Sequence, residues 1–226
     1  MKDITKTLHK MKDLHSTDED PDLNARIDEK EIKVAAVAKR LGFDDRNPKN
    51  LSIICRYVAR MALNAAKRGL FVTGDTGTGK TFALMLIAER CKIKRRDAGY
   101  VTAQEFSNLV SKEGSYNAVK KFTTDLKAEA WHQGRWDTHS YEFVDLIIDD
   151  VGAENEAIHF GRHSESLVEL IAARYDLWRE RGVRTHFTSN LTTDQIEERY
   201  GKRIASRIFE MCWVTKFEGN DRRKER

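Results

Sequence analysis

The feature that most constrains the fold is a glycine-rich run of eight residues, Gly74-Asp75-Thr76-Gly77-Thr78-Gly79-Lys80-Thr81. Glycines let the backbone turn tightly and direct several N–H groups at one anion, and Lys80 supplies a mobile cation for nucleotide phosphates. The Thr81 hydroxyl is a ligand suited to Mg²⁺. An apolar strand at residues 70–73 precedes the run and a helix at residues 82–88 follows it, as a phosphate-binding loop requires. The run therefore predicts a P-loop that binds ATP and Mg²⁺, with a glycine-rich turn that binds no nucleotide as the alternative.

The composition is that of a helix-rich globular chain. Of its 226 residues, 40% are hydrophobic and 34% are charged, which fits one main domain. No apolar stretch approaches the roughly 18 residues of a membrane span, and the amino terminus lacks the apolar core of a secretory signal. We therefore expect a cytoplasmic protein without membrane contact. Cys55, Cys91 and Cys212 are widely separated, so they indicate neither a disulfide framework nor a zinc site.

Positive charge is unevenly distributed along the chain. The net charge is +4, but residues 1–50 hold eleven Lys or Arg and eleven Asp or Glu, so the whole excess lies beyond residue 50. Such an excess fits contact with a polyanion, and a solvated basic face explains it equally well.

The amino-terminal part differs from the rest. Residues 1–25 have little apolar periodicity, which indicates an arm that is mobile or ordered by a partner. We expect a helix over residues 28–41 capped by Gly42, a linker over residues 44–50, and a second helix over residues 52–67. A domain boundary is placed after residue 48, so that residues 1–48 form a helical, partner-binding extension of the main domain, residues 49–226. A merely solubilising tail is the alternative for the arm.

Five short apolar runs alternate with helical stretches in the main domain. The strand candidates are residues 70–73, 100–102, 144–148, 185–188 and 214–217. Alternation of this kind predicts an α/β fold with a five-stranded parallel sheet flanked by helices. One helix is marked by a potential capping box at Ser166 and Glu169 and by Gly182 at its end.

Two carboxylates follow the third of these strands. Asp149 and Asp150 would stand at the carboxyl end of a parallel strand, where ligands collect. Asp149 suits the Mg²⁺ shell, and Asp150 suits orientation and polarisation of an attacking water. A buried strand that simply ends in two acidic turn residues is the alternative.

Two further elements are weaker on their own. Asn190 follows the fourth strand, where a neutral amide can bind the γ-phosphate or the water, although Ser-Asn is also common in turns. Arg203 and Arg207 share one helical face. An arginine supplied across a subunit boundary can neutralise charge on the transferring phosphoryl group, and a solvated basic face is the alternative.

The order of these motifs resembles that of the AAA+ ATPases of the DnaC/IstB type, a family of bacterial and phage replicative helicase loaders and transposon ATPase subunits. The motifs are the P-loop, residues 147–154, 188–190, 201–208 and 217–219, and the resemblance covers about residues 50–223. It implies an ATP-dependent homo-oligomer, with Asp149 and Asp150 as the Walker B pair and Asn190 as sensor 1. Arg207 resembles the arginine finger, with Arg203 as a weaker candidate.

The resemblance also implies that the chain has no carboxy-terminal helical lid. The usual lid arginine is then missing unless Arg222 or Arg223 replaces it. Phe82 departs from the His that commonly follows the Lys-Thr pair in this family. Both departures concern the rate and timing of hydrolysis more than the binding of ATP.

A contact with single-stranded DNA is expected after the second strand, where initiator-type relatives line a central channel. The candidates are Lys112, Lys120, Lys121, Lys127 and the run Trp131-His132-Gln133-Gly134-Arg135-Trp136. Basic side chains can follow phosphates while tryptophans stack on bases. Tryptophans that pack at a core edge, with solvated lysines, are the alternative.

The favoured function is an ATP-dependent, DNA-associated switch that loads a replicative helicase. A transposition ATPase with a transposase partner is the alternative within the family, and an ssDNA-binding adaptor that holds ATP without hydrolysis is the alternative of another class. A small-molecule kinase lacks support because no Arg-rich lid is present, and a GTPase lacks its Asn-Lys-x-Asp motif.

Overall fold

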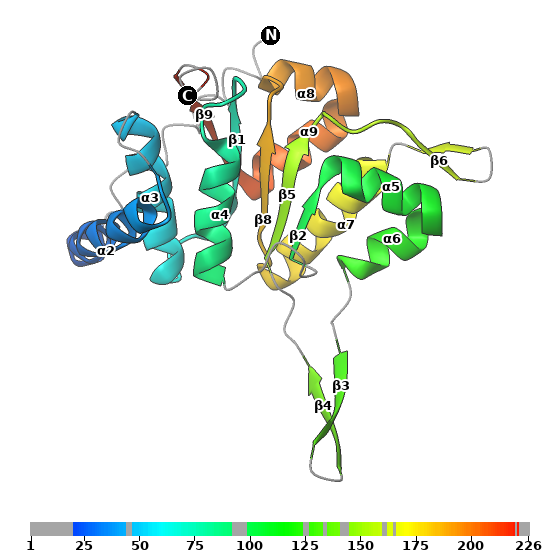
Figure 1. Ribbon diagram of the computed structural model, residues 1–226, viewed down its shortest axis with the longest axis horizontal. Helices are drawn as coiled ribbons and strands as arrows, with labels where there is room; N and C mark the ends of the chain where they lie inside the picture. The colour runs from blue at the N-terminus through cyan, green and yellow to red at the C-terminus, as the bar shows by residue number, and fades with distance from the viewer. Residues whose placement is uncertain are drawn as a thin grey trace.

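A five-stranded parallel sheet forms the centre of the protein, in the order β2-β5-β8-β1-β9 (Figure 1). The strands are β1 (Gly69–Gly74), β2 (Tyr100–Thr102), β5 (Leu146–Val151), β8 (Thr185–Ser189) and β9 (Cys212–Phe217). Each overlaps a strand expected from the sequence, so the prediction of a five-stranded parallel α/β fold is confirmed. The computed structural model describes residues 20–43, 47–91, 99–123, 127–132, 135–140, 145–159, 162–164, 166–219 and 221.

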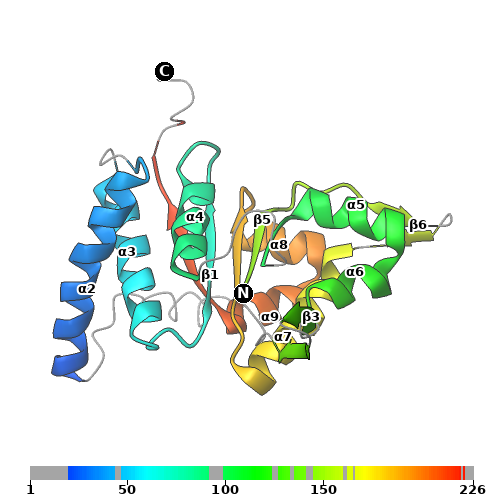
Figure 2. The ribbon, with the colours of Figure 1, turned by 60° about the horizontal axis from the view of Figure 1, so that its bottom comes forward.

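Helices cover both faces of this sheet (Figure 2). One layer holds α2 (Pro21–Arg40), α3 (Pro48–Ala62) and α4 (Lys80–Cys91). The other holds α5 (Ala103–Glu113), α6 (Ser115–Lys121), α7 (Ser166–Arg181), α8 (Thr193–Tyr200) and α9 (Lys202–Met211). Neighbouring residues of β1 divide between the layers, because Leu70 and Val72 pack with α3 and α4 while Phe71 packs with α7 and α9. Burial of both faces explains why β1 is apolar at three consecutive positions, residues 70–72, rather than alternating.

The amino-terminal helices begin earlier than expected. α2 starts at Pro21, with the Asp20 carboxylate accepting from the N–H groups of Asp22 and Leu23, and α3 starts at Pro48, with Asn47 as its cap. The predicted arm over residues 1–25 and linker over residues 44–50 are therefore wrong at residues 21–25 and 48–50. The reason is that proline is favoured in the first turn of a helix, where its missing N–H is not needed.

The second helix also ends earlier than expected, at Ala62 rather than near residue 67. Asn64 adopts a left-handed backbone with φ of 56°, and the N–H of Ala65 donates to the carbonyl of Arg60 at 2.8 Å. This turn ends the helix seven residues before Gly69, the glycine that marked the expected stop. At the end of α2 the predicted cap is present, since Gly42 has φ of +87°.

Two short hairpins are additions that the sequence did not predict. β3 (Lys127–His132) pairs with β4 (Arg135–Ser140), and β6 (Ala157–His159) pairs with β7 (Arg162–Ser164). The β3–β4 hairpin projects away from the body of the protein, at the end opposite α8 (Figure 1). Its side chains, like those of positions 124–144 and 157–166 as a whole, lie outside the described part of the structure.

The remaining helix predictions concern α7 and the carboxy terminus. α7 ends before Gly182 as expected, but the Glu169 carboxylate accepts from the Ser115 hydroxyl of α6, and the Ser166 side chain lies outside the described residues. No helix follows β9 among the residues that the structure describes. In the same part of the chain, no helix combines the length and apolar character needed to cross a membrane.

Candidate nucleotide-binding site

The glycine-rich loop connects β1 to α4 at the carboxyl edge of the sheet (Figure 1). Gly74, Gly77 and Gly79 have φ of 142°, 81° and 96°, values that favour glycine. Space excludes a side chain at two of them. A Cβ at Gly74 would lie 2.3 Å from the carbonyl oxygen of Phe217, and one at Gly77 would lie 2.0 Å from a carboxylate oxygen of Asp221. The loop is thus shaped both by its own turns and by the chain that passes over it after β9.

Lys80 lies inside the loop. Its side chain is 6% exposed in the fold, and its ammonium donates to the carbonyl oxygens of Gly74 at 2.8 Å and Asp75 at 2.7 Å. It also donates to the Asn190 side-chain oxygen at 2.7 Å, although the two residues are 110 positions apart in the chain. The structure therefore brings the predicted loop lysine and the predicted sensor amide into direct contact.

Asp149 is buried at the end of β5 and is surrounded by hydroxyl groups. Tyr100 donates to its Oδ2 atom at 2.7 Å, while Thr188 donates to Oδ1. Thr81 of the loop donates to Oδ1 at 3.4 Å. A hydroxyl and a carboxylate so placed are oxygen ligands of the kind that Mg²⁺ takes, so the two predicted metal residues fit that ion.

Asp150 follows with a different geometry. Its backbone has φ of 57°, the pairing of β5 with β8 shifts register between Ile148 and Val151, and its side chain is exposed. The N–H of Asp150 donates to Thr188 Oγ1 at 2.9 Å. One hydroxyl, that of Thr188, therefore holds the side chain of the first acid and the backbone of the second.

Tyr100 and Thr188 were not expected from the sequence. Both stand inside predicted strands, where a tyrosine or threonine is ordinary. A signal existed only for Thr188, which is polar in a strand whose residues are all buried. For Tyr100 no local signal distinguishes it, because its role depends on a contact with a residue 49 positions away.

Glu154 holds the turn that follows the two acids. Its side chain is 6% exposed, accepts from the Gly152 N–H at 2.8 Å and from the Tyr200 hydroxyl, and pairs with Arg199 at 3.2 Å. Burial and the charge of Glu154 raise the pKa of Tyr200 well above its usual value, so the phenol stays a hydrogen-bond donor. The acidic turn is in this way fastened to α8.

The predicted arginines lie on α9, away from these contacts. Arg207 is half-buried with its guanidinium 5.1 Å from the centre of the Tyr175 ring on α7, and Arg203 is exposed. Within the described residues no hydrogen bond or ion pair joins Arg207 to the glycine-rich loop. The structure of one chain therefore does not bring Arg207 to its own site. Arg222 and Arg223 lie outside the described residues.

The DNA candidates fall on helices α5 and α6 and on the β3–β4 hairpin. Lys112 is exposed on α5 and Lys120 on α6, while Lys121 pairs with Glu113 at 2.7 Å. Trp131 lies directly opposite Trp136 in the β3–β4 hairpin, which begins at Lys127. Gln133 and Gly134 lie outside the described residues.

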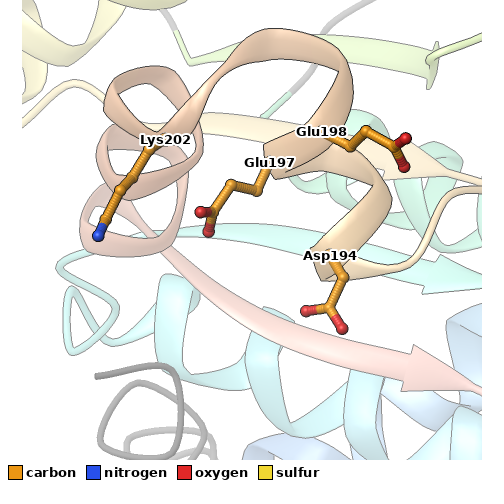
Figure 3. Close-up of a pocket in the computed structure, with 4 residues that line it drawn as sticks. All are labelled: Asp194, Glu197, Glu198 and Lys202. Carbon is orange, nitrogen blue, oxygen red and sulfur yellow. The ribbon is translucent and has the colours of Figure 1, made fainter. Parts of the chain in front are cut away.

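A shallow hollow of about 360 Å³ lies beside α8 and the start of α9 (Figure 3). It is lined by Asp194, Glu197, Glu198 and Lys202. Across the described part of the chain, no group of three or more His, Cys, Asp or Glu side chains is arranged to hold a metal ion. The hollow shares no residue with the glycine-rich loop, and we do not include it in the candidate site.

Comparison with solved structures identifies the fold. The structure of DnaI matches with a TM-score of 0.53 at 19% identity, covering 80% of this chain and 89% of that one. A Streptococcus pyogenes serotype M3 protein, provisionally described as a primosome component, matches at 0.52 and 20% identity, covering 79% and 85%. AMPPCP-bound DnaA from Aquifex aeolicus matches at 0.50 and 15% identity, covering 82% and 51%. No family model and no curated protein sequence matches the chain. The chain therefore shares the fold of these solved structures, a five-stranded parallel sheet flanked by helices.

Proposed function

We propose that this protein is an ATP-dependent AAA+ switch that acts as a replicative helicase loader in DNA replication. The observation that carries the proposal is the meeting of Lys80 with Asn190 inside a glycine-rich loop, beside Asp149 and Thr81. These four groups come from three separate parts of the chain, and an ATPase of the AAA+ fold needs them in one place. The order of the motifs and the likeness to DnaI support the loader function.

Binding of ATP uses residues that already lie at the glycine-rich loop. Lys80 exchanges the carbonyls of Gly74 and Asp75 for phosphate oxygens, and the N–H groups of the loop surround the phosphates. Thr81 and Asp149 hold Mg²⁺, which neutralises phosphate charge when bound.

Hydrolysis uses the groups at the edge of this site. Asp150, exposed beside the buried Asp149, orients the attacking water and accepts its proton. Asn190 hydrogen-bonds the γ-phosphate or the water without adding negative charge. Arg207 leaves the ring of Tyr175 and completes the site of a neighbouring subunit, so turnover depends on a homo-oligomer.

The helicase is bound through residues 1–48. α2 packs on α3 by burial of Ile27, Val34 and Ala38, and Arg56 of α3 donates to Asp28 at 2.7 Å. The opposite side of α2 carries Ile32, which is 73% exposed and leaves an apolar contact point for a partner.

Single-stranded DNA is the second partner. The exposed Lys112 and Lys120 supply phosphate contacts, and the hairpin that carries Trp131 and Trp136 supplies rings for stacking. This surface is joined through α5 to the segment just after the acidic turn, since Gln104 accepts from the N–H of Asn155 at 3.0 Å.

The experiment that tests the function measures ATP affinity and turnover, with and without single-stranded DNA, for the wild type and for Lys80→Ala. We expect turnover that DNA stimulates in the wild type and loss of ATP binding in Lys80→Ala, because the only ammonium inside the loop among the described residues is removed. Lys33→Ala is the control, because Lys33 is an exposed lysine paired with Glu29 on α2. Unchanged nucleotide affinity in Lys80→Ala would contradict the P-loop assignment.

Two other outcomes separate the alternatives. Tight ATP binding without turnover at any DNA concentration would favour the adaptor that holds ATP as a structural ligand. Recovery of a transposase rather than a hexameric helicase on residues 1–50 would favour the transposition ATPase.

A further inference from the structure

Tyr100 stands where β2 meets β5, on the same face of the sheet as Asp149. Tyr100 lies opposite Ile147 in the parallel pairing, and Asp149 is two residues further along β5. Residues two apart in a strand share a face, so the Tyr100 side chain can reach the carboxylate diagonally. It does so with 7% of the residue exposed, and the phenol donates to Asp149 Oδ2 at 2.7 Å.

The two oxygens of Asp149 consequently have different neighbours. Oδ2 takes the buried phenol of Tyr100, whereas Oδ1 faces the hydroxyls of Thr188 and Thr81. Thr81 is the loop residue that would share Mg²⁺ with Asp149. Oδ1 is therefore the oxygen on the Thr81 side. The hydrogen bond from Tyr100 fixes the rotation of the carboxylate and so keeps Oδ1 on that side.

This difference matters because cations make different demands on a carboxylate. Mg²⁺ requires six ligands in a near-ideal octahedron and takes one oxygen from each carboxylate, whereas Ca²⁺ accepts more ligands at longer distances and often takes both oxygens of one carboxylate. Turning both oxygens of Asp149 toward Thr81 would break the hydrogen bond that the buried Tyr100 phenol donates to Oδ2. The Tyr100 bond thus opposes the geometry that favours Ca²⁺.

We propose that Tyr100 is a positioning residue that limits Asp149 to one-oxygen coordination and thereby makes the nucleotide site selective for Mg²⁺ over Ca²⁺. The inference rests on the proposed function, because it assigns the ion to the Thr81–Asp149 position of an ATP site.

The test measures metal binding directly, with full-length protein saturated with ADP. Bound Mn²⁺ is followed by electron paramagnetic resonance and is displaced by Mg²⁺ or by Ca²⁺, which yields the ratio of their inhibition constants. Tyr100→Phe removes only the phenol oxygen, and Tyr57→Phe is the matched control, because its buried hydroxyl donates to the Arg68 carbonyl at 2.8 Å, outside the candidate site. Thermal unfolding and ADP affinity in excess chelator are measured for each protein.

The wild type and Tyr57→Phe should bind Mg²⁺ in clear preference to Ca²⁺. In Tyr100→Phe the preference should shrink about tenfold, as expected when a group that orients a ligand is lost, while ADP affinity without metal stays unchanged. Thr188→Val removes the hydroxyl that also positions Oδ1 but keeps the Tyr100 bond, so any change in affinity should be the same for Mg²⁺ and Ca²⁺.

An unchanged Mg²⁺/Ca²⁺ ratio in Tyr100→Phe would overturn the inference, as would an equal loss of preference in Tyr57→Phe or a selective gain of Ca²⁺ binding in Thr188→Val. These results leave the proposed function intact provided that the wild type binds ADP and Mn²⁺. Failure of the wild type to bind either would contradict the proposed function itself, and this inference with it.

Discussion

Asp150 occupies a backbone conformation that most side chains avoid. A left-handed φ of 57° costs a non-glycine residue about 1 kcal/mol or more, although aspartate tolerates it better than most. Both faces of the sheet are covered by helices, so strand alternation does not expose this carboxylate. The carboxylate is exposed instead by the irregular pairing of β5 with β8 after Ile148. The Thr188 hydroxyl stabilises this irregular backbone by accepting a hydrogen bond from the Asp150 N–H. Local strain of this kind is typical of a residue whose position serves chemistry.

Asp150→Asn should therefore separate ATP binding from turnover. The amide keeps the size of the side chain and its tolerance of the left-handed backbone, but it cannot accept a proton from water. We expect turnover to fall by about 10²- to 10⁴-fold with ATP affinity unchanged, measured by steady-state hydrolysis and by equilibrium binding. Asp194→Asn, at an exposed position on α8, is the control. Normal turnover in Asp150→Asn would remove this residue from the mechanism.

At the scale of elements, α3 connects the amino-terminal extension to the nucleotide site. The side chains of Asn47 and Asn50 at its start donate to the carbonyl of Glu218, immediately after β9. Gly219 is the next residue, and two positions beyond it Asp221 lies against Gly77 of the loop. A change in α3 can therefore reach the loop through one short segment, and the exact ends of this helix matter.

The carboxyl end of α3 gives a test of stability. Asn64 has φ of 56°, a conformation that glycine adopts freely and alanine adopts at a cost of about 1–2 kcal/mol. Asn64→Ala should therefore lower the free energy of unfolding by about 1 kcal/mol, while Asn64→Gly should leave it unchanged or raise it slightly. Urea unfolding measures both, and the two variants serve as each other's control. Equal stability of Ala and Gly at this position would show that the left-handed turn is absent in solution.

Across the whole molecule, the edge of the sheet opposite the nucleotide loop is held by an ion pair. Asp145 precedes β5 and accepts from the Arg184 backbone at 3.0 Å and from its guanidinium at 2.7 Å, beside the fully buried His186. Burial opposes the ionisation of Asp145, but the neighbouring His186 ring and the hydrogen bonds and charge of Arg184 outweigh it and hold the pKa of Asp145 well below the usual range. This carboxylate therefore stays ionised and joins two central strands.

The depressed pKa predicts a dependence of stability on acid. A carboxyl group whose pKa is lower in the folded state stabilises the fold at pH values above its pKa in the unfolded chain, which is near 3.9. This contribution is lost as the pH falls through the pKa of the folded state. The free energy of unfolding of the wild type should therefore fall more steeply below about pH 5 than that of Asp145→Asn. Denaturant unfolding from pH 7 to pH 3 measures the slope, with the exposed Asp194→Asn as control. Parallel slopes in wild type and Asp145→Asn would contradict the ion pair.

The proposed homo-oligomer is the second prediction at this scale. Arg207→Ala leaves Lys80, Thr81 and Asp149 untouched, so it should keep ATP affinity. A homogeneous assembly should lose turnover by about 10³-fold, because each boundary lacks the charge that stabilises the transferring phosphoryl group. When Arg207→Ala is mixed with Lys80→Ala, which keeps Arg207, the mixture should regain activity. It should do so at boundaries where the intact nucleotide site of one variant meets the intact arginine of the other.

Arg203→Ala is the control for this experiment, because Arg203 is an exposed arginine one turn earlier on α9. Turnover and sedimentation are measured on the same mixtures. If the two inactive variants assemble together without regaining activity, or if Arg207→Ala is fully active alone, Arg207 is a surface residue of each chain.

The sequence alone determined the elements whose causes are local. The glycine spacing of the loop, the apolar strands and the acids that end β5 are set by neighbouring residues, so they could be predicted without the rest of the chain. The predicted helices begin too late because residues 1–25 have little apolar periodicity and residues 44–50 were assigned to a linker. The capping side chains of Asp20 and Asn47 nevertheless stand directly before Pro21 and Pro48.

Tertiary structure alone decided which side chains meet in the site. Tyr100 and Thr188 reach Asp149 from positions 49 and 39 residues away, and Lys80 reaches Asn190 across 110 residues. Local patterns mark Lys80 and Asn190, and Thr188 is polar in a buried strand, but no local pattern shows which of these side chains meet. They meet because the parallel order β2-β5-β8-β1 brings the carboxyl ends of four strands together, where buried polar groups must find partners.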